Sequence, residues 1–151
     1  MAIERITLSP RTYVGIRRKV PVTELQGYFS EVLPRVMRWV TESGLEPASA
    51  PMARWHAMDP QTGVADVQAG CFVAEPVPDD GDITCDTTPA GEALRLTHVG
   101  SYDDMKRSWG ALFRHASDQG LTPGAGWEIY VDDPSKTDPE TMRTEITLPV
   151  R

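Results

Sequence analysis

The chain has 151 residues, of which 40% are hydrophobic and 25% are charged, a composition that fits one ordinary globular domain. Its formal net charge of −7 argues against a nucleic-acid-binding surface, for which a basic patch is expected. The N-terminus lacks the apolar core of a signal peptide, and no run approaches the roughly 20 apolar residues that span a bilayer. With only two cysteines, Cys71 and Cys85, the chain is expected to be soluble and cytoplasmic, with no membrane partner.

The first half of the chain predicts extended segments around one helix. The apolar spacing indicates a helix over 22–43 that Gly44 ends, and Pro34 should kink this helix or divide it in two. The dipeptide Asp59-Pro60 is typical of the start of a hairpin turn. The strands of this half are expected over 3–8, 12–20, 52–58 and 64–73.

The second half predicts the same elements after a polar, proline-rich loop at 75–82. Ser101 is expected to cap a helix whose apolar stripe includes Trp109, and Gly120 should end it. The strands of this half are expected over 83–88, 93–99, 126–131 and 142–150.

The strand at 126–131 is the most informative of these, because its two faces differ in chemistry. Trp127, Ile129 and Val131 alternate onto one face, which we expect to cover a helix. Glu128 and Tyr130 alternate onto the other face and place a carboxylate beside a phenol.

The two halves also share short sequence motifs, which indicate an internal repeat of about 70 residues. The segment Gly44-Leu45-Glu46-Pro47 corresponds to Gly120-Leu121-Thr122-Pro123, and Asp59-Pro60 corresponds to Asp133-Pro134. Alignment on these pairs sets Arg54 opposite Glu128. The fold class that follows is α+β: one domain over 1–151 with two pseudo-symmetric βαββ units, at about 3–74 and 83–151.

In such a duplicated fold, each helix covers one face of an antiparallel sheet, and the uncovered faces can meet over a central ligand groove. Strand alternation predicts which side chains would line that groove. They are Tyr13, Arg54, His56, Phe72, Glu128 and Tyr130.

Several short motifs, in order along the chain, resemble the GyrI-like small-molecule-binding family, which is related to the effector-binding domains of AraC- and MerR-type multidrug regulators. The motifs are Pro10-Arg11-Thr12-Tyr13-Val14-Gly15, Leu33-Pro34 with Trp39-Val40, His98-Val99-Gly100-Ser101-Tyr102, Trp127-Glu128-Ile129-Tyr130 before Asp133-Pro134, and Glu145-Ile146-Thr147-Leu148-Pro149-Val150. The resemblance implies two fused SHS2-type units and places Glu128 in the ligand groove. In regulators of this family a DNA-binding segment precedes the domain, whereas here the pattern starts at residue 3, so direct nucleic acid binding is not expected.

Some stand-alone members that this chain resembles hydrolyse cyclopropane-bearing genotoxins with a glutamate and a tyrosine in a tryptophan-lined groove. That resemblance makes Trp39 and Trp109 further ligand-binding candidates, although the apolar spacing of Trp39 also fits a core residue. It implies Glu128 as the general base and Tyr130 or Tyr102 as the proton donor.

Three functions therefore stand in order. The first is binding of amphipathic compounds, cationic aromatic ones included, because a poorly solvated carboxylate among aromatic faces attracts such ligands. The second is hydrolysis of a strained-ring toxin in the same groove, and the third is inhibition of a protein partner such as gyrase. Glu128 could equally be a solvated strand residue or a salt-bridge partner of Arg54. Neither a cofactor nor a metal is expected, since His56, His98 and His115 have no metal-ligand spacing.

Overall fold

The computed structural model describes residues 2–151, which divide into two compact units. We call Pro10–Thr88 the N-unit, and we call Pro89–Arg151, together with the residues up to Ser9, the C-unit.

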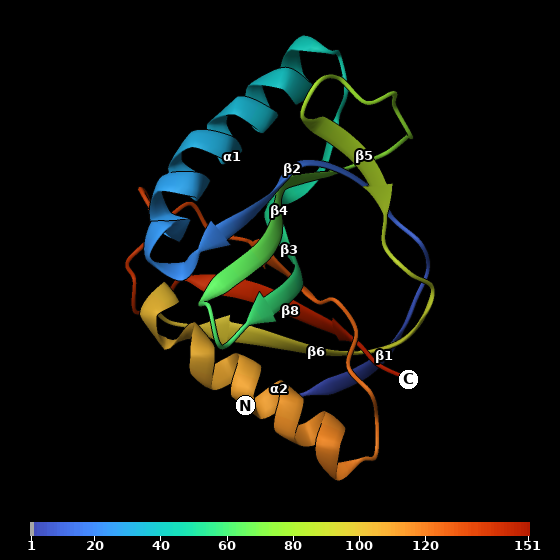
Figure 1. Cartoon of the computed structure of the whole chain (residues 1–151), viewed down its shortest axis with the longest axis vertical. Helices are drawn as coiled ribbons and strands as arrows, with labels where there is room; N and C mark the ends of the chain where they lie inside the picture. The colour runs from blue at the N-terminus through green and yellow to red at the C-terminus, as the bar shows by residue number, and fades with distance from the viewer. Residues whose placement is uncertain (1) are drawn as a thin grey trace. The chain divides into compact units, whose positions relative to one another are not determined.

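The N-unit is an antiparallel sheet covered on one face by a helix. Its strand order is β3 (Pro47–Asp59), β4 (Val64–Val73), β2 (Thr12–Pro21) and β5 (Ile83–Thr87). A short helix, η1 (Val22–Glu24), leads into α1 (Leu25–Glu42), which buries Tyr28 and three valines against β2 and β4. Pro34 lies inside α1, and the helix continues through it without division (Figure 1).

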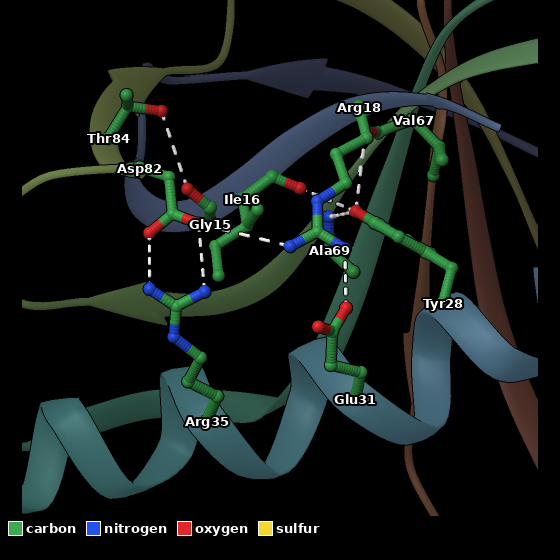
Figure 2. A network of polar contacts seen from close by, with 10 residues as sticks. All are labelled: Gly15, Ile16, Arg18, Tyr28, Glu31, Arg35, Val67, Ala69, Asp82 and Thr84. Carbon is green, nitrogen blue, oxygen red and sulfur yellow. Dashed lines mark hydrogen bonds and ion pairs between the residues drawn. The ribbon is translucent and has the colours of Figure 1, made fainter.

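Polar side chains tie α1 to the sheet that it covers (Figure 2). The buried Tyr28 hydroxyl donates to the carbonyl of Ile16 and accepts from the amide of Ala69. Nearer the surface, Arg35 donates to both carboxylate oxygens of Asp82, in the loop before β5. The aspartates of that loop are exposed, and each also has a partner on the protein.

The C-unit has the same general plan. Its strand order is β1 (Glu4–Leu8), β6 (Gly91–Val99), β8 (Arg143–Pro149) and β7 (Trp127–Tyr130), all antiparallel. The short helix η2 (Tyr102–Asp104) leads into α2 (Met105–Asp118). The core between α2 and the sheet contains Leu94, Leu96, Met105, Leu112, Ala116, Ile146, Leu148 and Val150.

These elements confirm the predicted α+β class and nearly all the predicted strands and helices. The strand expected at 3–8 pairs with β6, and the strand expected at 83–88 pairs with β2. The first of these strands therefore belongs to the C-unit and the second to the N-unit, whereas the repeat assigned each to the other half. The single-domain assignment, the repeat boundaries and the groove between the halves stay predictions.

Two glycines face each other where β2 and β4 approach most closely. Gly15 pairs with Gly70, and a β-carbon on Gly70 would lie 1.8 Å from the carbonyl oxygen of Val14. A β-carbon on Gly15 would lie 2.7 Å from the carbonyl oxygen of Ala69. Glycine at both positions is therefore what allows the two backbones to lie this close together.

Candidate functional site

The faces of β7 are the reverse of those predicted. Glu128 pairs with Ile146 and Tyr130 pairs with Thr144, and directly paired residues share a face. Ile146 belongs to the core beneath α2, so Glu128 and Tyr130 lie on the helix-covered face of the sheet. Trp127 and Ile129, which were expected to cover the helix, are buried on the opposite face.

The prediction assumed that the apolar side chains of β7 face the helix, whereas Trp127 and Ile129 are buried on the other face. A β-bulge in β3 separately shifts the repeat alignment. Arg54 pairs with Gln68 and Trp55 with Val67, but Ala57 is the next residue to pair, so His56 is an extra residue in this strand. The repeat alignment counted back from the Asp-Pro dipeptides through this bulge without allowing for it. Once the bulge is included, Glu128 corresponds to Ala53 instead of Arg54, and both residues lie on the helix side of their strands.

The carboxylate of Glu128 is held between two hydrogen-bond donors. The indole Nε1–H of Trp109, on α2, donates to Oε2 at 2.6 Å, and the Tyr130 hydroxyl donates to Oε1 at 2.7 Å. Only 5% of Glu128 is exposed. A buried carboxyl group needs hydrogen-bond partners, so this side chain is oriented by the fold and is not a solvated surface group.

Aromatic rings continue outward from this carboxylate to the surface. Tyr102 packs edge-on against Tyr130 at 5.6 Å between ring centroids, and Phe113 stacks on Trp109 at 5.8 Å. Tyr102 and Phe113 are among the most exposed large hydrophobic side chains of the described residues. We call Glu128, Trp109, Tyr130, Tyr102 and Phe113 the Glu128 cluster.

Three carboxylates act on Tyr102 in the Glu128 cluster. Burial raises the pKa of Tyr102, and the carboxylates of Glu128, Asp133 and Asp132 raise it further. The phenol of Tyr102 therefore stays protonated near neutral pH and can act as a hydrogen-bond donor. Of these three carboxylates, Asp132 is already paired with the Arg143 guanidinium at 2.9 Å.

Gly126 gives Trp109 the space that it needs. A β-carbon on Gly126 would lie 2.7 Å from Cη2 of the Trp109 ring and 2.8 Å from the carbonyl oxygen of Thr147. The indole of Trp109 thus packs directly on the backbone at the start of β7, which brings its Nε1 to the carboxylate of Glu128.

The remaining predicted site residues lie mostly in the N-unit, where they converge on Gln68. The buried amide of Gln68 accepts from the Tyr13 hydroxyl at 2.9 Å and contacts Nε2 of His56 at 2.8 Å. It donates to Thr84 at 3.0 Å and to Asp86 at 2.7 Å. Gln68 was not among the predicted site residues, although a glutamine in the middle of an apolar strand is a visible signal.

Two arginines and two aromatic rings extend this Gln68 network. Arg54 donates to the Tyr13 hydroxyl at 3.2 Å, and the Arg11 guanidinium lies 3.9 Å from the ring centroid of Phe72. Burial raises the pKa of Tyr13 and lowers the pKa of His56. Tyr13, Arg54, His56 and Phe72 therefore share the face of the sheet that α1 does not cover, as predicted.

Trp39 joins neither group. It lies near the end of α1, and its indole Nε1–H donates to Asp80 at 2.8 Å, so it holds the loop before β5. Its role as a ligand-binding residue stays a prediction.

His98 is a buried polar residue with two partners. Its Nδ1 lies 2.7 Å from the Ser108 hydroxyl on α2, and its Nε2 lies 2.9 Å from the carbonyl oxygen of Ser101. The predicted side-chain cap at Ser101 is not formed, and Ser101 contributes its carbonyl instead. His98 is thus a buried histidine whose two ring nitrogens both have partners.

Within residues 2–151, no three histidine, cysteine or acidic side chains are grouped so that they could hold a metal ion. Over the same described residues, no helix is both long and apolar enough to cross a membrane.

A buried glutamate among aromatic rings fits the resemblance that the motifs indicated. The GyrI-like small molecule binding domain family matches the chain over residues 1–151. The chain belongs to this family. No curated protein sequence matches it.

Solved structures with this fold include regulators and a hydrolase. EcmrR in a DNA complex aligns with 99% of the chain at a TM-score of 0.86 and 22% identity, and the chain spans 57% of that protein. The EcmrR C-terminal domain alone aligns at 0.85 and 20% identity, over 99% of this chain and 97% of that one.

Two further structures are more distant. SAV2435 bound to tetraphenylphosphonium aligns at a TM-score of 0.70 and 15% identity, over 100% of this chain and 94% of that one. A hydrolase encoded by lin2189 from Listeria innocua aligns at 0.61 and 15% identity, over 99% and 91%. At these identities the likeness concerns the fold.

Proposed function

We propose that the chain binds amphipathic organic cations and that Glu128 is the residue that recognises their charge. The observation that carries the proposal is the buried carboxylate, which Trp109 and Tyr130 hold at 2.6 and 2.7 Å. Two neutral donors orient the carboxylate between them. An ion in a poorly solvated setting attracts a cation more strongly than a solvated one does.

The aromatic rings around the carboxylate supply the second part of the recognition. Tyr102 and Phe113 are exposed and pack on the two residues that hold Glu128. Each ring face can add roughly 0.5–2 kcal/mol of cation–π attraction to the burial of an apolar ligand. A flat or propeller-shaped lipophilic cation satisfies both demands, and the tetraphenylphosphonium bound by SAV2435 has this chemistry.

Calorimetric titration with tetraphenylphosphonium and with neutral triphenylphosphine oxide tests the proposal. Glu128→Gln keeps the shape of the side chain but removes its charge, so affinity for the cation should fall about tenfold or more. Affinity for the neutral compound should stay the same. Glu75→Gln, at an exposed loop glutamate, is the matched control and should change neither affinity. Equal losses for both ligands, or no loss at all, would refute charge recognition by Glu128.

A second function, hydrolysis of a strained cyclopropane ring, is favoured by one contact. The Tyr130 hydroxyl is hydrogen-bonded to Glu128, which puts a proton donor beside a carboxylate base. In this reaction Glu128 takes a proton from water, and the resulting hydroxide attacks a ring carbon. The electron pair of the broken ring bond moves to a conjugated oxygen, which Tyr130 or Tyr102 protonates.

Binding ranks first because the same contact also limits catalysis. Both carboxylate oxygens already accept a hydrogen bond, so a water must share an oxygen with Trp109 or Tyr130. Incubation with cyclopropane-bearing compounds, followed by mass spectrometry, separates the two functions. A product heavier by one water that Glu128→Gln abolishes, while substrate still binds, would establish the hydrolase. Unchanged ligand mass supports the binder.

A further inference from the structure

We infer that His98 is a positioning residue that fixes Tyr102 and Trp109, which we call the two aromatic walls of the Glu128 cluster. The inference rests on the proposed function, since it concerns the same binding site. His98 itself does not belong to the cluster, because its hydrogen bonds go to Ser108 and Ser101.

The first step concerns the direction of these hydrogen bonds. The carbonyl oxygen of Ser101 can only accept, so Nε2 of His98 carries the proton and donates to it at 2.9 Å. In the tautomer that carries its proton on Nε2, Nδ1 accepts from the Ser108 hydroxyl at 2.7 Å. Only 4% of His98 and 2% of Ser108 are exposed, so water does not compete for these bonds.

The second step concerns the residues that follow in the chain. Ser101 directly precedes Tyr102, and Ser108 directly precedes Trp109. Tyr102 packs on Tyr130, and Trp109 donates to Glu128. The imidazole of His98 thus connects β6 to the backbone just before Tyr102 and to the turn of α2 that carries Trp109.

The third step concerns the turn that makes this possible. Gly100 has a φ of +137°, a conformation that residues with a β-carbon rarely adopt, and its amide donates to the carbonyl of Met142 at 2.8 Å. The chain therefore reverses within two residues of His98, which brings the Ser101 carbonyl back to the ring three residues earlier. The amide of Asp104 donates to the same carbonyl at 3.2 Å, which begins η2.

Two substitutions separate the two arms of His98. In His98→Asn the side-chain amide can occupy the place of Nδ1, so the bond with Ser108 is retained and the bond with Ser101 is lost. In His98→Gln the amide can reach the place of Nε2, so the opposite holds. Ser108→Ala removes the Ser108 arm alone and should reproduce the effect of His98→Gln on Trp109.

The first measurement is the indole N–H spectrum of the ¹⁵N-labelled full chain, which has four tryptophans. Trp109→Phe assigns the Trp109 resonance. This resonance should shift in His98→Gln and Ser108→Ala and should keep its place in His98→Asn. The Trp39 resonance, from an indole bonded to Asp80 in the N-unit, is the internal control and should not move. General loss of stability would not produce such a selective shift.

The second measurement is affinity for tetraphenylphosphonium. His98→Asn and His98→Gln should each weaken binding roughly three- to tenfold, because each releases one wall. If both variants keep the parental affinity and indole spectrum while Glu128→Gln loses affinity, His98 is not a positioning residue. If Glu128→Gln keeps its affinity, the proposed binding site fails, and the indole shifts still decide whether His98 positions Trp109. If either His98 variant fails to fold, Ser108→Ala still decides whether the bond between His98 and Ser108 positions Trp109.

Discussion

The indole nitrogen of Trp109 and the carboxylate of Glu128 lie 2.6 Å apart and join α2 to β7. Trp109→Phe keeps a ring that can stack on Phe113 but removes the donor to a buried charge. We expect it to lower the free energy of unfolding by about 1–3 kcal/mol, measured by urea denaturation. Trp39→Phe removes a similar bond from a less buried site and should cost about 1 kcal/mol or less. Equal losses would contradict the importance of burial here.

Gly126→Ala tests the contact between the β7 backbone and the Trp109 ring. The new β-carbon would fall 2.7 Å from the ring and 2.8 Å from the backbone oxygen of Thr147, so one of them must shift. We expect a loss of about 1–3 kcal/mol in unfolding free energy. Gly110→Ala is the matched control on α2, where a β-carbon meets nothing within 4 Å. That change should stabilise the chain by up to about 1 kcal/mol, because alanine favours a helix.

Gln68→Leu tests the N-unit network. Leucine has a similar volume but cannot bond to Tyr13, His56 or Asp86. Because buried polar groups would lose their partners, we expect a loss of about 2–4 kcal/mol in chemical denaturation. Gln26→Leu, on the exposed face of α1, should stay within about 0.5 kcal/mol. A neutral result at Gln68 would mean that water replaces the network.

His56 should make stability depend on pH in acid. Burial lowers its pKa from the ordinary value of 6.5, with Arg17 and Arg54 acting in the same direction and the bond to Gln68 and the charge of Asp66 opposing them. The unfolded chain therefore binds the histidine proton at a higher pH than the folded chain does. Stability should fall as pH decreases below 6.5 towards the lower pKa of the folded state.

The comparison that isolates this effect is His56→Gln, which can keep a bond to Gln68 but does not titrate. The unfolding free energy of the parent minus that of the variant should be constant above pH 6.5. Below pH 6.5 this difference should decrease, because only the parent loses the contribution of His56. A difference that stays flat through this range would show that His56 titrates alike in both states.

Much of the fold was predictable because local chemistry marks it. The helix over 22–43 follows from apolar spacing and from Gly44, which has the positive φ of a helix C-cap. Pro34 does not divide the helix, and Val32 and Val36 on either side of it are buried in the core.

The candidate site was predicted in composition but not in geometry. Glu128 and Tyr130 were correctly seen to share a face, because alternation is local to one strand. Which face that is depends on the pairing of β7 with β8, which has no signal in a short window. The partnership of Glu128 with Trp109 spans 19 residues and two elements, so it needs the folded chain.

The facing pair Gly15 and Gly70 limits how this sequence can vary through generations. Even alanine at Gly70 would put its methyl group 1.8 Å from a backbone oxygen, which neither a new rotamer nor a smaller neighbour can relieve. The ordinary route of protein change, a substitution followed by compensation next door, is therefore closed at this crossing. Sequence changes in the N-unit should therefore spare these two positions. Folded members of a library of random variants should retain glycine at both.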